Sequence, residues 1–314
     1  MSLNSSRLPH NLSDTLARLY SRLHPIRVLI WISVLSASVS TNSALATDFD
    51  PIVSTIRAAE QKFHARIGVA IYDVANETNW SYHGDSRFPI LSTFKTLACA
   101  KLLHAVDNHD LNLKKLIRIK PADIVSYSPV MKQHIGNFLS LTEICAATMT
   151  TSDNAAANII LTEIGGPAAL TQFLRSLDDR TTILARIEPE LNEAVPLDVR
   201  DTTSPNSMVS NLNRLLYTPV LSPGSRQLIK DWLIDNAVAD ALLRSVLPAN
   251  WSIADRTGAG NYGSRAITAI VWSRQRSPLI IAIYLTETEA SMTQRNQIIV
   301  DIGQAIFNQV VKIE

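Results

Sequence analysis

The sequence predicts an α+β fold in which a five-stranded antiparallel sheet is flanked by N- and C-terminal helices and carries an inserted all-α lobe. Three observations lead to this prediction. Strand-like segments rich in β-branched residues occur near both ends of the chain. The long stretch between them has mainly the apolar spacing of helices. Amphipathic segments with a helical period lie outside the strands at either end, which is the arrangement of a sheet completed by the C-terminus.

The first residues are expected to be a signal peptide that is removed. Arg27 is followed by the apolar run 28–35, then by small residues, and Ala44-Leu45-Ala46 has the A-x-A form of a cleavage site. A transmembrane anchor is the alternative, but the apolar run is too short to span a bilayer. We therefore assign 1–46 to a signal peptide with an extended basic region and 47–314 to a single mature domain. The expected location is periplasmic or secreted, with no membrane association after cleavage.

The N-terminal part of the mature chain predicts a helix and a hairpin. Apolar residues recur with helical spacing across residues 50–63, so this segment opens the domain as a helix. Residues 65–74 have the pattern of a strand. The polar run 75–79 is a turn, and residues 80–83 begin the returning strand.

From residue 92 onward the pattern is mainly helical for well over a hundred residues. The segments with the clearest helical spacing are 141–149, 155–164 and 167–177. The late strands and the final amphipathic helix are 251–257, 267–273, 279–286 and 293–311. This order predicts an α/β lobe of about residues 47–90 and 236–314 and an all-α lobe of about residues 91–235. The cleft between two such lobes is the natural place for a site.

Charge and metal-ligand content make two classes of function improbable. The net charge is +1 with 18% charged residues and no basic stripe, so nucleic acid is not an expected partner. The 7 histidines are scattered without an H-x-H or H-x-x-x-H pair, so we expect neither a metal nor another cofactor. At 46% hydrophobic residues the chain can bury a sizeable core, and a monomer is the default expectation.

The chain has 2 cysteines, Cys99 and Cys145, both in the mature part. In an exported protein a single pair predicts a disulfide, and two buried free thiols are the alternative. In the loop-entropy model a bridge over this separation would contribute about 4 kcal/mol to stability.

The first motif that could carry chemistry is Ser92-Thr93-Phe94-Lys95, which enters an Ala- and Leu-rich helix. Ser92 and Lys95 would lie one turn apart on one face. A lysine in a poorly hydrated site has a lowered pKa and can activate a serine hydroxyl, and a helix N-terminus can bind an oxyanion. Because S-x-x-K also occurs by chance, the motif alone is weak evidence.

A second motif, Ser152-Asp153-Asn154, lies between two predicted helices. Ser152 could carry a proton to a leaving nitrogen, and Asn154 could bind a substrate amide. The alternative is an ordinary helix N-cap, since Ser, Asp and Asn are the preferred capping residues. Asp153 is expected to have such a local structural purpose.

A third motif lies in a polar stretch with little helical period, which runs from Arg186 to about residue 203. Long ordered loops in compact domains are usually functional. Glu188 and Asn192 could hold a water between them as base and positioner, and Arg186 and Asp201 could clamp the loop as an ion pair. A solvated acidic loop is the alternative. The proline after Glu188 allows a cis peptide bond.

The fourth motif ends a predicted strand. Arg256 and Thr257 offer a charge and a hydroxyl to a substrate carboxylate, a group that arginine suits. Gly258 and Gly260 leave room for a ligand along the strand edge, and Arg265 could add a second positive charge or face solvent. An ordinary hairpin turn is the alternative.

The order of these four motifs along the chain resembles that of the class A serine β-lactamases. The motifs are S-x-x-K, S-D-N, E-P-x-L-N and a strand with a basic residue followed by Thr and Gly. The resemblance covers essentially the whole mature chain, including the cysteine pair and the turn at residues 126–129. Wider stretches are similar to the carbenicillin-hydrolysing subgroup: Arg87-Phe88-Pro89, residues 147–151 before Ser152, residues 158–161 after it, and residues 243–248.

The resemblance implies the serine β-lactamase and penicillin-binding-protein fold and a role for each motif. Ser92 would be the acylated nucleophile, Lys95 its activating partner, and Ser152 the relay to the β-lactam nitrogen. Glu188, with Asn192, would activate the deacylating water. Whether Lys95 or Glu188 takes the serine proton during acylation is disputed for the family.

The remaining implied contacts are with the substrate. The backbone N–H groups of Ser92 and Ala259 would form the oxyanion hole. The residues implied to bind substrate are Tyr127 at the entrance, Asn154 at the acylamino side chain, Asn192, and the group Arg256, Thr257, Gly258, Ala259 and Arg265. The common family residue at position 256 is Lys, and the carbenicillinase subgroup has Arg there.

The resemblance therefore implies hydrolysis of penicillins, including carbenicillin, and antibiotic resistance. A penicillin-binding transpeptidase or carboxypeptidase is one alternative, and a β-lactam sensor that stays acylated is another. Both share the fold, so the fold does not distinguish them. They lack a water-activating carboxylate such as Glu188 in this kind of loop, and that residue together with Asn192 favours the β-lactamase.

Overall fold

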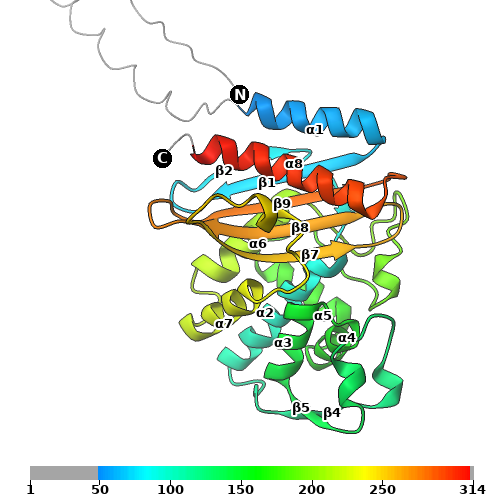
Figure 1. Ribbon diagram of the computed structural model, residues 1–314. Coiled ribbons are helices and arrows are strands. Elements are labelled where there is room, and N and C mark those ends of the chain that lie inside the picture. Colours follow the sequence, from blue (N-terminus) through cyan, green and yellow to red (C-terminus); the bar gives the residue numbers. More distant parts are fainter. Residues whose placement is uncertain (1–48, 312–314) are drawn as a thin grey trace, which may run out of the picture. The chain divides into compact units, whose positions relative to one another are not determined.

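The computed structural model describes residues 49–311, and the fold is α+β, as the sequence predicts (Figure 1). The predicted signal peptide and its cleavage site lie outside the described residues. Within the described part, no helix is long and apolar enough to cross a membrane.

One antiparallel sheet of five strands organises the domain. Across the sheet the strands are β2 (Thr78–Tyr82), β1 (Arg66–Asp73), β9 (Leu279–Thr286), β8 (Arg265–Trp272) and β7 (Ser252–Ala259). The N-terminal hairpin joins the C-terminal strands through the pairing of β1 with β9, in which Val69 lies opposite Ile283. The sheet is therefore completed by the C-terminus, and the prediction of one sheet formed from both ends of the chain is confirmed.

Both faces of the sheet are buried, which explains the nearly continuous apolar sequence of its central strands. Since side chains alternate between faces, Ile67, Val69 and Ile71 of β1 pack in one hydrophobic cluster and Ala70 in the other. The first cluster is covered by α1 (Asp50–Phe63) and α8 (Met292–Val311), which lie together on one side of the sheet in Figure 1. Each fully buried isoleucine contributes about 1.5–3 kcal/mol.

The other helices lie on the opposite side of the sheet (Figure 1). They are α2 (Phe94–Asp107), α3 (Leu141–Thr151), α4 (Asn154–Glu163), α5 (Gly166–Ser176), α6 (Pro205–Tyr217) and α7 (Pro223–Ile234). Local signals set where they begin. Ser140 and Glu143 form a capping box at α3, and the hydroxyls of Ser204 and Ser222 cap α6 and α7.

The predicted all-α lobe also contains short strands, which corrects one expectation. Inside it β4 (Leu116–Arg118) pairs with β5 (Phe138–Ser140), and β6 (Thr202–Thr203) pairs with β3 (Phe88–Pro89), which lies just before the lobe. Strands of two or three residues are too short to show a period of two, so the sequence pattern does not reveal them. The proposed boundaries of the two lobes stay predictions.

The two predicted hairpin regions differ slightly from expectation. β2 begins at Thr78, inside the predicted turn, and β7 continues to Ala259, two residues beyond its predicted end.

The disulfide is confirmed: Cys99 on α2 is bonded to Cys145 on α3, with 6.0 Å between the two Cα atoms. It links the helix that follows Ser92 to the helix that leads to Ser152.

Candidate active site

Ser92 lies in a single 3₁₀ turn, Leu91–Thr93, that leads directly into α2. Leu91 has a φ of 52°, which is costly for a residue with a branched side chain. The turn is held by Thr93, whose hydroxyl donates to the carbonyl of Ile90 and lies 3.0 Å from the Tyr284 hydroxyl on β9. Ser92 is therefore fixed at the start of a helix, as the motif predicts.

Lys95 follows one turn later, and its side chain is completely buried. Its ammonium donates to the Asn154 side chain at 2.6 Å, to the Ser152 carbonyl at 2.8 Å and to the Ser152 hydroxyl at 3.2 Å. It also lies 3.1 Å from a carboxylate oxygen of Glu188. Desolvation lowers the pKa of Lys95 to about 8, although the Glu188 carboxylate opposes this shift. A fraction of this amine is thus neutral near pH 7 and able to accept a proton.

In the S-D-N segment the middle residue caps a helix, and its two neighbours contact Ser92 and Lys95. Asp153 is the N-cap of α4 and accepts the backbone N–H of Ala156, so the capping interpretation is correct for this residue. Ser152, which has a φ of 64°, donates its hydroxyl to the Ser92 hydroxyl at 3.2 Å. Asn154 extends from the start of α4 to Lys95. The cap therefore orients its two neighbours towards Ser92 and Lys95.

The polar loop brings Glu188 to the same place. Its carboxylate is fully buried, accepts from the Asn192 side chain, and lies 3.5 Å from the Ser92 hydroxyl. The peptide bond between Glu188 and Pro189 is cis. The solvated-loop alternative is wrong for this carboxylate, because it has no exposed surface.

An ion pair closes the loop at its neck, as predicted. Arg186 Nε lies 2.5 Å from Asp201 Oδ2, and the other oxygen of Asp201 accepts the backbone N–H groups of Ala185 and Arg186 at 2.7 and 2.9 Å. Arg186 also contacts Glu193. These bonds tie together the two ends of the segment that carries Glu188.

Sequence reasoning missed Asn158, which fixes the backbone of Glu188. The side-chain amide of Asn158 donates to the Glu188 carbonyl at 2.8 Å and accepts the Glu188 N–H at 2.8 Å. Asn158 lies on α4, one turn after Asn154, in an otherwise apolar Ala- and Ile-rich helix. An isolated amide four residues from a predicted site residue is the one signal that could have indicated it.

Arg256 on β7 lies behind the two serines and is fully buried. Its guanidinium donates to the Ser92 carbonyl at 3.1 Å, to the Met149 carbonyl at 3.2 Å, and to the Ser152 hydroxyl. Desolvation lowers the pKa of Arg256 to about 10, so the group stays charged at neutral pH. Arg256 therefore fixes the backbone of Ser92 and the hydroxyl of Ser152.

The strand edge leaves no room for larger side chains. A Cβ at Gly258 would lie 2.9 Å from the Ser92 nitrogen, and one at Gly260 would lie 2.9 Å from the Asn192 carbonyl oxygen. Only glycine lets β7 approach the nucleophile and the loop this closely. Thr257 is buried and Ala259 is exposed.

Two predicted residues are bonded to neighbours of the central group. Tyr127, with a φ of 60°, is 57% exposed, and its carbonyl accepts the Asn154 N–H at 2.9 Å. Arg265 is buried and does not face solvent; it donates to the Gly258 carbonyl at 3.0 Å and to Asn296 at 2.9 Å.

Within residues 49–311 no group of three or more His, Cys, Asp or Glu could hold a metal ion.

The arrangement has the parts of a two-step acyl-transfer site. The Ser152 hydroxyl lies 3.2 Å from the Ser92 hydroxyl and 3.2 Å from the amine of Lys95, whose pKa is lowered. A buried carboxylate lies 3.5 Å from the Ser92 hydroxyl. The carboxylate has an amide partner that can share a water with it.

Comparisons with known proteins agree with this chemistry. Residues 51–310 match the model of the "Beta-lactamase enzyme family". The β-lactamase CARB-3 of Pseudomonas aeruginosa is 47% identical over 283 residues, which cover 90% of this chain and 98% of that protein. The chromosome-encoded β-lactamase of Vibrio parahaemolyticus is 48% identical, with a TM-score of 0.81 over 82% of this chain and 98% of that one. The class A β-lactamase of the last common ancestor of Gram-negative bacteria is 43% identical, with a TM-score of 0.81. The match covers 82% of this chain and 99% of that one.

Proposed function

Because the chain belongs to the class A β-lactamases, a family of hydrolases, we propose that it opens the β-lactam ring of penicillins, carbenicillin among them, through an acyl-enzyme on Ser92. This activity gives antibiotic resistance. The two steps are acylation of the serine by the antibiotic and hydrolysis of the resulting ester.

Acylation uses the serine-lysine pair. The Ser92 hydroxyl attacks the β-lactam carbonyl while its proton passes to Lys95, whose lowered pKa suits it to accept that proton. The new oxyanion is held by the backbone N–H groups of Ser92 and Ala259. When the ring C–N bond breaks, the Ser152 hydroxyl gives its proton to the nitrogen, and Lys95 returns one to Ser152 over 3.2 Å.

Substrate binding falls to the residues around this centre. Asn154 presents its amide to the acylamino side chain, and Tyr127 lines the entrance. The substrate carboxylate is held by Arg256, Thr257 and Arg265. The buried positions of the two arginines, within 3.1 Å of the Ser92 and Gly258 carbonyls, support a cationic pocket at this end.

Deacylation uses the loop. A water between Glu188 and Asn192 loses its proton to Glu188 and attacks the ester carbon. As the ester C–O bond breaks, Glu188 passes this proton to the Ser92 oxygen 3.5 Å away, which regenerates the hydroxyl. The observation that carries the proposal is the position of the fully buried Glu188 carboxylate, 3.5 Å from the Ser92 hydroxyl. A transpeptidase or a sensor domain has no need of such a group.

The deciding experiment is the intact mass of the purified mature chain after mixing with excess carbenicillin, with the drug's disappearance followed in parallel. We expect the drug to be consumed without a persistent adduct, because deacylation is fast. A one-to-one adduct that persists while the drug remains would instead identify a penicillin-binding or sensor protein. Absence of both adduct and turnover would contradict the nucleophile assignment.

We also infer a periplasmic or secreted monomer whose partner is its small-molecule substrate. The basic and apolar leader with its A-x-A site supports export, and the Cys99–Cys145 disulfide fits an oxidising compartment. Size-exclusion chromatography with light scattering on the mature chain checks the oligomeric state.

A further inference from the structure

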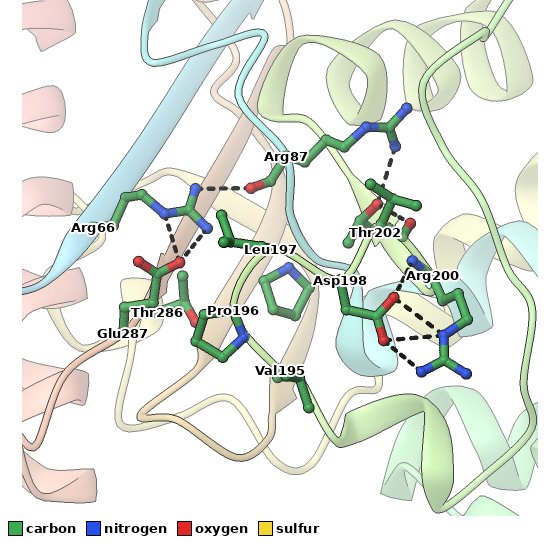
Figure 2. A pocket seen from close by; sticks show the side chains of 13 residues that line it. Arg66, Arg87, Val195, Pro196, Leu197, Asp198, Arg200, Thr202, Thr286 and Glu287 are labelled. Carbon is green, nitrogen blue, oxygen red and sulfur yellow. Dashed lines mark hydrogen bonds and ion pairs between the residues drawn. The ribbon is translucent and has the colours of Figure 1, made fainter.

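A cavity of about 390 Å³ lies away from the residues just described, behind the second half of the polar loop. Loop residues 194–200 form one side of it, and the ends of the strands β1, β3, β6 and β9 form the other. Figure 2 shows Arg66 with Glu287 at one end, Asp198 with Arg200 at the other, and Leu197 and Pro196 between them. Its volume is in the range of small-molecule sites.

The loop presents an apolar surface to this cavity. Val195, Leu197 and Val199 are 41%, 98% and 53% exposed, and Pro89 and Pro196 also line the cavity. Leu197 has two unfavourable features. Its apolar side chain is exposed to water, and its φ of 68° is a costly backbone conformation for a leucine. A ligand with an apolar body would cover this surface.

The charges around the cavity are not balanced. Three arginines and two carboxylates line it, and the Arg87 guanidinium is directed away from Leu197 towards Thr202 (Figure 2). Arg66 is paired with Glu287 at 2.8 Å, and Arg200 with Asp198 at 2.7 Å. Arg87 donates to the Thr181 carbonyl and to a threonine hydroxyl, which are both neutral. One positive charge is therefore left without a counter-charge in the lining.

We propose that this cavity is a second ligand site, for a small monoanion with an apolar body such as a medium-chain carboxylate. The anionic group pairs with the arginines, for which a planar carboxylate is the natural partner. The apolar body lies against Val195, Pro196 and Leu197. A cation or a neutral polar ligand would meet the wrong charge and leave the apolar wall uncovered.

The site is connected to the catalytic loop through Asp198. This carboxylate pairs with Arg200 at the cavity and lies 3.7 Å from Arg186, the residue that closes the neck of the loop two positions before Glu188. A bound anion competes with Asp198 for Arg200. The freed Asp198 then draws Arg186 away from Asp201, and the position of Glu188 shifts.

This connection rests on the proposed function, and it predicts an effect on one step only. Occupancy lowers the deacylation rate about threefold, within the range of coupling through such networks, and leaves acylation unchanged. Single-turnover kinetics with and without ligand measure the two steps separately.

The test of the site is fluorescence titration with 8-anilinonaphthalene-1-sulfonate, an apolar monoanion, with competition by decanoate. We expect saturable one-to-one binding that persists when Ser92 is acylated by carbenicillin in a Glu188→Gln variant. Leu197→Ser and Arg200→Gln should each weaken binding about tenfold, by loss of an apolar contact and of a charged partner. The matched controls Leu116→Ser and Arg274→Gln change exposed residues elsewhere and should leave binding unaltered.

Several results would overturn the site. These are no saturable binding, displacement of the probe by acylation of Ser92, and equal losses in the controls. Thermal unfolding of each variant separates lost binding from lost folding. Binding without any change in deacylation would overturn the connection to the loop but not the site. If the proposed function failed, no adduct would form, yet the titration and its variants would still report on the cavity.

Discussion

Lys95 Nζ lies 3.1 Å from Glu188 Oε1, and both side chains are completely buried. A buried ion pair is weak evidence for stability, because desolvation of the two ions offsets their attraction. Here each partner has further bonds, from Lys95 to Asn154 and Ser152 and from Asn192 to Glu188. The same oxygen of Glu188 lies 3.5 Å from the Ser92 hydroxyl, so the ion pair lies directly beside the proposed nucleophile.

The first prediction concerns the Glu188→Gln variant. Removing the carboxylate takes away the attraction that raises the pKa of Lys95, while desolvation stays, so this pKa should fall below about 8. More of the amine is then neutral at pH 7. If Lys95 accepts the serine proton, the acidic limb of the pH profile of the acylation rate should move to lower pH. The acyl-enzyme should accumulate, because deacylation is lost.

Stopped-flow measurement of the acylation rate across pH gives this profile, and intact mass confirms the adduct. Loss of acylation itself in the variant would show that Glu188 is the base for the first step. The two candidates for the disputed proton acceptor are thereby separated. Glu190→Gln, on the same loop, is the matched control.

The second prediction concerns Asn158, which holds the Glu188 backbone by two bonds of 2.8 Å. In Asn158→Ala the carboxylate remains but its position is no longer fixed. Deacylation should slow by about tenfold to a hundredfold, since small displacements of a catalytic group have effects of this size. Acylation should change much less. Asn308→Ala on α8 is the control, and burst kinetics that show both steps slowed equally would contradict this positional role.

Much of the fold follows from periodicity. The helix 50–63 and the final helix were predictable from their helical period, and β1, β8 and β9 from apolar, β-branched runs of eight residues. β3 and β6 were not, because each has only two residues and is set by the partner strand. Such strands are determined by tertiary pairing and not by a local sequence pattern.

The site is predictable only in part for the same reason. Ser92 and Lys95 are linked by one helical turn, so their proximity follows from the local sequence. The contact between Ser92 and Glu188 joins residues 96 positions apart, and no local rule supplies it. Only the order of the motifs, through the family resemblance, led to it. Asn158 escaped because the resemblance had assigned no role to that position.

The third prediction concerns the disulfide between Cys99 and Cys145, which closes a loop with a sequence separation of 46. The double variant Cys99→Ala/Cys145→Ala should lose about 2–4 kcal/mol in free energy of unfolding, because the unfolded chain regains entropy. Urea unfolding of the oxidised and double-variant proteins measures the difference. The same treatment with reductant should reproduce it. An unchanged midpoint in both cases would mean that α2 and α3 hold together without the bridge.

The last prediction concerns Arg256, whose guanidinium reaches the Ser92 and Met149 carbonyls and the Ser152 hydroxyl at once. Lysine keeps the charge but offers a single nitrogen in place of a planar fork, so Arg256→Lys cannot hold all of these acceptors and a substrate carboxylate together. Carbenicillin carries a second carboxylate on its side chain, and ampicillin does not. We therefore expect kcat/KM to fall about tenfold for carbenicillin and about threefold or less for ampicillin.

Arg274→Lys, an exposed position, controls for the substitution itself, and both substrates should be unaffected by it. The ratio of the two losses is the informative quantity. A general disturbance of Ser92 and Ser152 would slow both antibiotics alike, because both acylate the same serine. Equal losses would therefore assign Arg256 to the positioning of Ser92 and Ser152 alone. An excess loss for carbenicillin would show that the guanidinium also selects the carboxylated side chain.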